Sequence, residues 1–124
     1  MPRALVVDDS RAMRMILSKT LAQTGFEVVE AANGREALET MDREGASIGL
    51  VLLDWNMPEL SGIEVVEKLR SRSAFKGVRV VMVTTETEIE QMARALEAGA
   101  DEYIMKPFTR EAVEDKLRLI GVLP

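Results

Sequence analysis

The stretch IGLVLLD at residues 48–54 is an unbroken apolar run that ends in a carboxylate. A second run, ALVV at residues 4–7, leads in the same way into Asp8 and Asp9. Continuous apolar runs of this length are typical of strands buried on both faces of a parallel sheet. If these two strands are neighbours, three carboxylates meet at one edge of the sheet, where like charges about 4 Å apart repel by roughly 4 kcal/mol per pair at an effective dielectric of 20. Such a cluster calls for a divalent cation.

Strand-like runs alternate with helix-period segments five times along the chain, which predicts an α/β domain with a mostly parallel sheet. The expected strands cover residues 4–7, 26–31, 48–53, 78–83 and 103–105. Polar residues predict where the helices begin, and they are Ser10 or Asp9, Asn33, Ser61 and Thr109. The first and fourth helices are expected to bury one apolar stripe each, namely Met13, Ile16, Leu17 and Leu21, and Ile89, Met92, Ala93 and Leu96.

Five strands that are each followed by a helix suit the doubly wound order 2-1-3-4-5, in which ligands bind outside the carboxyl ends of the strands. The residues at those ends are Asp8, Asp9, Asp54, Thr84 and Lys106. Each has an ordinary explanation when taken alone: a helix cap, a turn residue, a strand residue or a solvated lysine. Together they would need five independent coincidences at one sheet edge. The sequence therefore predicts a site made of three acids, a hydroxyl and an ammonium.

Composition excludes several other kinds of site. The chain contains no cysteine and no histidine, so disulfides, thiolate sites, zinc fingers and Ser-His-Asp triads are ruled out. A net charge of -5 argues against a nucleic-acid surface. The apolar runs are strand-sized and the first residues lack a signal-peptide layout, so we expect no membrane insertion and a cytoplasmic location. At 124 residues, we expect one domain over residues 1–124 without a linker or effector domain.

In their order and spacing, these residues resemble the receiver domain of two-component response regulators, most closely the stand-alone chemotaxis regulators. The resemblance covers essentially the whole chain and rests on five segments, DDS at 8–10, DWNMP at 54–58, VTTE at 83–86, GAD at 99–101 and YIMKPF at 103–108. It implies a flavodoxin-like (βα)5 fold and a phosphorylation-controlled signalling switch. Such a switch is not an enzyme, and its only chemistry would be self-phosphorylation and autodephosphorylation.

The resemblance also implies a role for each acid of the predicted site. Asp54 would be the phosphoacceptor, since a carboxylate can attack a phosphoryl donor and form an aspartyl phosphate. Asp9 and Asp54 would bind Mg²⁺ directly, the backbone carbonyl of Asn56 would supply a third oxygen, and Asp8 would act through a water.

The remaining roles concern the bound phosphoryl group. By the resemblance, Lys106 and Thr84 would each hold a phosphoryl oxygen, and Tyr103 would turn inward when Thr84 moves. Asn56 and Glu86 would tune the lifetime of the phosphoaspartate by orienting a water. The bond between Lys106 and the following proline is expected to be cis.

The role of Trp55, directly after the phosphoacceptor, is open on the sequence alone. It is either a core aromatic or a partly exposed probe beside the site. The resemblance favours the partly exposed position.

Three other functions fit parts of the pattern. A Mg-dependent phosphohydrolase with an aspartyl-phosphate intermediate would carry an acid–base carboxylate two residues after its nucleophile, where this chain has Asn56, which cannot transfer protons. A flavodoxin-type cofactor carrier shares the strand order, but Asp8 and Asp9 would repel a flavin phosphate. A scaffold role without phosphorylation leaves the acid cluster unexplained.

The resemblance implies a histidine kinase as phosphodonor and an output by protein contact. If the pathway is chemotaxis, the downstream target would be a flagellar switch protein, with a phosphatase as a further partner. The segments at 54–56 and 84–86 favour the chemotaxis type, and a regulator of a phosphorelay or another pathway is the alternative. We expect a monomer that binds neither nucleic acid nor membrane.

Overall fold

The computed structural model describes residues 2–85 and 89–123. Five parallel strands form one sheet in the order β2-β1-β3-β4-β5, which confirms the predicted order. The strands are β1 (Arg3–Val7), β2 (Glu27–Ala31), β3 (Ile48–Asp54), β4 (Arg79–Thr84) and β5 (Glu102–Met105). The α-helices are α1 (Arg11–Gln23), α2 (Gly34–Glu44), α3 (Gly62–Arg70), α4 (Ile89–Ala98) and α5 (Arg110–Leu119). Short 3-10 helices lie at Gly45–Ser47 and Ser73–Phe75.

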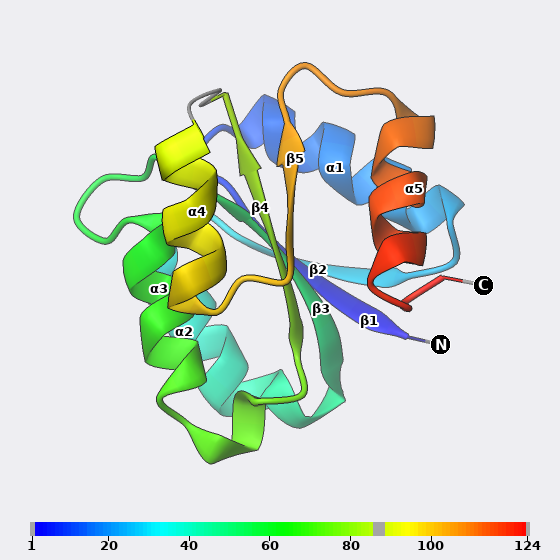
Figure 1. Cartoon of the computed structure of the whole chain (residues 1–124). Coiled ribbons are helices and arrows are strands. Elements are labelled where there is room, and N and C mark those ends of the chain that lie inside the picture. The colour runs from blue at the N-terminus through cyan, green and yellow to red at the C-terminus, as the bar shows by residue number, and fades with distance from the viewer. Residues whose placement is uncertain (1, 86–88, 124) are drawn as a thin grey trace.

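Helices cover both faces of the sheet. Figure 1 shows α2, α3 and α4 on one side of the sheet and α1 and α5 on the other, and each group encloses its own apolar cluster. The central strands are therefore buried on both faces, and every residue of β3 except Gly49 is buried. This double burial explains why the central strands are unbroken apolar runs in the sequence.

The predicted helix starts are confirmed. The side chains of Ser10, Asn33, Ser61 and Thr109 each accept a hydrogen bond from the backbone N–H three residues on, at the start of α1, α2, α3 and α5. Ser61 and Glu64 form a reciprocal capping box. Of the two residues expected at the start of α1, Ser10 is the N-cap.

The predicted inward face of α4 is wrong. Ala95 is fully buried and Ala98 packs against the same apolar cluster, whereas Ala93 is exposed and Leu96 is 48% exposed. The side chain of Ile89 lies outside the described residues. Small residues let α4 approach the sheet closely, and the longer apolar side chain of Leu96 remains outside.

Two other apolar side chains differ from expectation in opposite directions. Ile16 on α1 is 50% exposed. The buried face of this helix is centred on Leu17 and Leu21, and Ile16 lies outside it. Trp55 is only 8% exposed, so the expectation of a partly exposed ring is wrong and the residue is a core aromatic. Its backbone N–H donates to the Val83 carbonyl at 3.3 Å, so the residue extends the sheet beyond β3 and its ring joins the cluster under α3.

Within residues 2–85 and 89–123, no helix has both the length and the apolar character needed to cross a membrane.

Candidate functional site

The acid cluster arises from the register of two central strands. Val7 of β1 lies opposite Leu53 of β3, so the residues that follow, Asp8 and Asp54, emerge side by side at the carboxyl edge of the sheet. Carboxylate oxygens of Asp8, Asp9 and Asp54 all lie within 4.8 Å of one another. Asp8 is 1% exposed and Asp54 is 7% exposed, whereas Asp9 is open to solvent. The structure thus brings the three predicted acids together.

Lys106, which follows β5, reaches into the same cluster. Its Nζ lies 3.2 Å from Asp8 Oδ2 and 3.2 Å from Asp54 Oδ1. The backbone N–H of Lys106 donates to the Thr84 carbonyl at 2.8 Å, which ties the end of β5 to the end of β4. The bond between Lys106 and Pro107 is cis, as predicted.

Burial and charge shift the pKa values of both partners. The pKa of Asp54 is raised to about 6, first by burial and then by the neighbouring charge of Asp8, while Lys106 opposes the rise. Burial alone would lower the pKa of Lys106, but the carboxylates of Asp54 and Asp8 outweigh it and hold that pKa above its ordinary value. Lys106 therefore stays cationic, and Asp54 is mostly ionised at neutral pH.

The donor set fits a hard divalent cation. Three carboxylates and one ammonium leave two negative charges in excess when all four groups are ionised. Carboxylate oxygens are the ligands that Mg²⁺ prefers, and this ion is usually bound by one or two carboxylates together with water. The exposed position of Asp9 gives such an ion access from solvent.

The other predicted residues lie around this cluster at different depths. Thr84 ends β4, is 3% exposed and lies opposite Met105 of β5. Asn56 lies in the exposed loop after β3, and Tyr103 is half-buried on β5. Glu86 lies outside the described residues.

Arg14 of α1 supports the site but was not identified from the sequence. Its Nη1 donates to the Asp8 carbonyl at 2.6 Å, and its Nε lies 3.4 Å from Glu30 Oε1 of β2. The Asp8 carboxylate is also fixed, since its Oδ1 accepts the Ser10 N–H at 2.8 Å. These bonds join the loop after β1 to β2 and α1. The two contacts of Arg14 link separate elements, so no local pattern indicated them.

Gly62, the first residue of α3, supports the site from the other side. A Cβ at this position would lie 2.5 Å from the Asp54 carbonyl oxygen and 2.7 Å from the end of Met82. The Gly62 N–H donates to the Trp55 carbonyl at 3.0 Å. Only glycine lets the start of α3 approach the end of β3 this closely.

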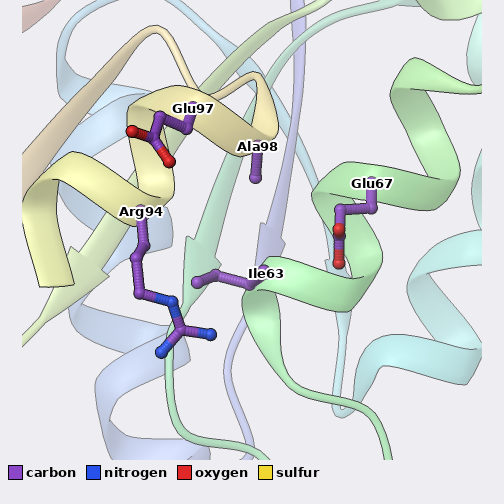
Figure 2. A pocket seen from close by; sticks show the side chains of 5 residues that line it. All are labelled: Ile63, Glu67, Arg94, Glu97 and Ala98. Atoms are coloured by element: carbon purple, nitrogen blue, oxygen red, sulfur yellow. The ribbon is translucent and has the colours of Figure 1, made fainter.

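A separate hollow of about 330 Å³ lies between α3 and α4. Figure 2 shows its lining, in which Ile63 and Glu67 come from α3 and Arg94 extends from α4 past Ile63. Glu97 and Ala98 complete the lining. None of these residues belongs to the acid cluster, so this hollow is distinct from the candidate site.

An acid cluster paired with a lysine, at the carboxyl edge of a sheet in the order 2-1-3-4-5, defines a receiver-type phosphoacceptor domain. The chain belongs to the response regulator receiver domain family, whose model matches residues 4–118. It is therefore a phosphorylation-controlled signalling switch rather than a classical enzyme.

The relatives point to chemotaxis. Chemotaxis protein CheY1 of Helicobacter pylori is 44% identical over 119 residues, which are 95% of each chain. A chemotaxis protein CheY homolog of Campylobacter jejuni is 40% identical over 116 residues, which are 93% of this chain and 88% of that one. The solved structure of Vibrio cholerae chemotaxis protein CheY4 matches with a TM-score of 0.90 and 36% identity, over 97% of this chain and 98% of that one.

A chain in the CheX-CheY-BeF3-Mg²⁺ complex from Borrelia burgdorferi also matches, with a TM-score of 0.90 and 28% identity over 96% of this chain and 88% of that one. This switch is thus homologous to chemotaxis regulators.

Proposed function

We propose that Asp54 is the residue that accepts the phosphoryl group. Its position supports this assignment, because it lies between the Lys106 ammonium at 3.2 Å and the carboxylates of Asp8 and Asp9. Both Asp8 oxygens already accept hydrogen bonds, from Ser10 and Lys106. Asp54 Oδ1 accepts from Lys106, so we assign Oδ2 as the nucleophile.

In the transfer, Asp54 Oδ2 forms a bond to phosphorus while the bond from phosphorus to the leaving group breaks. With acetyl phosphate the leaving group is acetate, which departs with the electron pair of the broken bond and needs no proton. With a kinase phosphohistidine, the leaving imidazole takes up a proton from water. The raised pKa of Lys106 keeps its ammonium charged beside the phosphoryl oxygens, and Thr84 donates its hydroxyl to another of them.

The acid cluster would hold Mg²⁺ through the carboxylates of Asp9 and Asp54, the Asn56 backbone carbonyl and, by way of a water, Asp8. When bound, the ion supplies positive charge that offsets the repulsion between the acids and an incoming phosphoryl group. With so few protein ligands, we expect binding on the order of millimolar.

The proposed output is a change of surface. Phosphorylation would draw the Thr84 hydroxyl toward the phosphoryl group and let the Tyr103 ring turn inward, which changes the face formed by α4, β5 and α5. A histidine kinase is the proposed donor and a flagellar switch protein the proposed target. The Borrelia complex, in which a CheY is bound to CheX, supports a phosphatase as a further partner.

Labelling tests the phosphoacceptor. Acetyl phosphate with Mg²⁺ should add one phosphoryl group to the wild-type chain, as read by intact mass, and none to Asp54→Asn. Chelating the metal before the reaction should also abolish labelling. The control is Asp115→Asn, which removes an exposed carboxylate on α5 and should label like wild type. Full labelling of Asp54→Asn would assign a different nucleophile.

The lifetime of the phosphorylated form should depend on Asn56. This residue lies in the exposed loop two positions after Asp54, where its amide would orient the attacking water. Replacing Asn56 with leucine should lengthen the lifetime, measured as the decay of phosphorylated protein after the donor is removed. Glu86→Leu should act in the same direction. Decay rates that ignore both substitutions would contradict this role.

A further inference from the structure

Lys116 of α5 lies over the ring of Tyr103. Its Nζ is 4.4 Å from the ring centroid and 3.2 Å from Oε1 of Glu102. The same Glu102 oxygen accepts the backbone N–H of Tyr103 at 3.0 Å. These three residues, which we call the β5–α5 clasp, join the start of the strand to the helix.

We propose that Lys116 is a positioning residue that holds the Tyr103 ring where it lies in this structure, and that it thereby sets how readily the receiver switches. The inference rests on the proposed function, in which the Tyr103 ring turns inward on phosphorylation. It assigns to Lys116 a part in the unphosphorylated state.

The topology leaves room for such a restraint to act. β5 lies at the edge of the sheet, and no other strand of residues 2–85 and 89–123 covers its outer side. Ile104 packs with α5 on one face of the sheet, whereas Tyr103 packs against the cluster on the opposite face. Lys116 lies on the face of the sheet covered by α5, whereas the Tyr103 ring packs on the opposite face. The lysine side chain therefore reaches around the open edge of β5 to contact the ring.

The surroundings of the ring show that packing alone does not fix it. Tyr103 and Lys116 both line a hollow of about 340 Å³ beside the start of α5, so the ring is not enclosed on this side. The clasp itself is well anchored, since the side chains of Lys116 and Glu102 are only 31% and 18% exposed. The ion pair between Lys116 and Glu102 does not involve the ring, so we expect it to persist when the ring rotates.

Rotation of the ring therefore costs the cation–π contact and leaves the rest of the clasp intact. A contact of this kind at a partly exposed site shifts a two-state equilibrium by about two- to fivefold. Loss of the Lys116 charge should favour the inward ring by that factor and tighten binding of any ligand that selects it.

The experiment uses the only tyrosine of the chain as a probe. With 3-fluorotyrosine incorporated, the ¹⁹F signal of Tyr103 is followed while beryllium fluoride, a phosphoryl mimic, is titrated in the presence of Mg²⁺. In Lys116→Met, the ¹⁹F chemical shift before any beryllium fluoride is added should lie closer to its value at saturation. The apparent dissociation constant for beryllium fluoride should fall about threefold. Lys116→Arg, which keeps the cation, should restore both values.

The matched control is Arg118→Met, which removes the same charge from the same helix at a residue paired only with Asp115 among the described contacts. It should behave like wild type. Glu102→Gln weakens the ion pair that orients the ammonium, and it should move the shift in the same direction by a smaller amount.

The possible outcomes distinguish failure of the proposed function from failure of the positioning role of Lys116. A wild-type chain that gives no ¹⁹F response to beryllium fluoride overturns the proposed function and the positioning role with it. A wild-type response that Lys116→Met and Glu102→Gln leave unaltered overturns the positioning role alone. Failure of Lys116→Arg to restore the wild-type values would also overturn it, because the effect would then not depend on charge.

Discussion

At the scale of single residues, Asp54 is held in a state that burial makes unfavourable. Removing a carboxylate from water disfavours its ionised form, and the charge of Asp8 adds to the effect, so its pKa rises from 3.8 to about 6. We expect the same burial to favour the proposed reactivity of Asp54. A buried carboxylate with few competing solvent contacts is available to attack a phosphoryl donor once positive charge is brought to the site.

The raised pKa predicts a dependence of stability on pH. Between about pH 4 and pH 6 the folded chain binds more protons at Asp54 than the unfolded chain does, so stability from this group is present at low pH and lost as pH rises through 6. A shift of this size corresponds to about 3 kcal/mol. In metal-free buffer, the unfolding free energy of wild type should fall relative to that of Asp54→Asn by most of this amount, about 2 kcal/mol, from pH 4 to pH 7.

Urea unfolding at a series of pH values measures the difference. The comparison with Asp54→Asn removes the contributions of other acids, such as Glu44, whose pKa is lowered by its hydrogen bond to Arg3. A difference between the two proteins that stays constant over this range would contradict the assignment of the buried charge to Asp54.

At the scale of elements, the site depends on how α3 meets β3. The Gly62→Ala substitution would place a Cβ 2.5 Å from the Asp54 carbonyl, so the backbone of one element must shift. We expect a loss of stability of about 1–3 kcal/mol and slower labelling of Asp54. The measurements are thermal unfolding and the rate of phosphorylation by acetyl phosphate.

The control for this substitution is Gly49→Ala on β3. No atom lies within 4 Å of a Cβ built at Gly49. Since alanine also restricts the unfolded chain, Gly49→Ala should be neutral or stabilising by up to about 1 kcal/mol. Equal destabilisation by the two substitutions would show that the close approach at Gly62 is not the cause.

Sequence patterns predicted the positions of the helices and strands well, but they did not predict which side of every helix faces the core. Buried strands and N-cap residues are local signals, so the five strands and the starts of four helices were predictable. The inward face of α4 was not, because alanines line both sides of this helix and only packing decides that Ala95 is buried and Ala93 exposed. The burial of the Trp55 ring was likewise not predictable, because it depends on the strand pairing that continues past Asp54.

At the scale of the whole molecule, the two edges of the sheet differ in how their acids are satisfied. At the amino edge, Asp101 accepts from Arg70 at 2.9 Å and from the Val80 N–H at 2.8 Å, and Arg70 also donates to the Gly99 carbonyl at 2.9 Å. At the carboxyl edge, Asp8 and Asp54 share Lys106, and the exposed carboxylate of Asp9 lies beside them. Strand order and strand ends predicted the acids. Long-range partners such as Arg70 and Asp101 could be assigned only once the fold brought them together.

The excess charge at the carboxyl edge predicts that a divalent cation stabilises the entire fold. A ligand that binds only the folded chain adds about 1.4 kcal/mol of stability at roughly ten times its dissociation constant. For a chain of 124 residues this raises the melting temperature by about 5 °C. Calorimetry with about 10 mM Mg²⁺, compared with sodium chloride at equal ionic strength, should show this rise in wild type. Asp9→Asn should lose most of it, because it removes a carboxylate that we assign to the ion. An equal rise in the two proteins would place the cation elsewhere, since the acids at this edge would then not be its ligands.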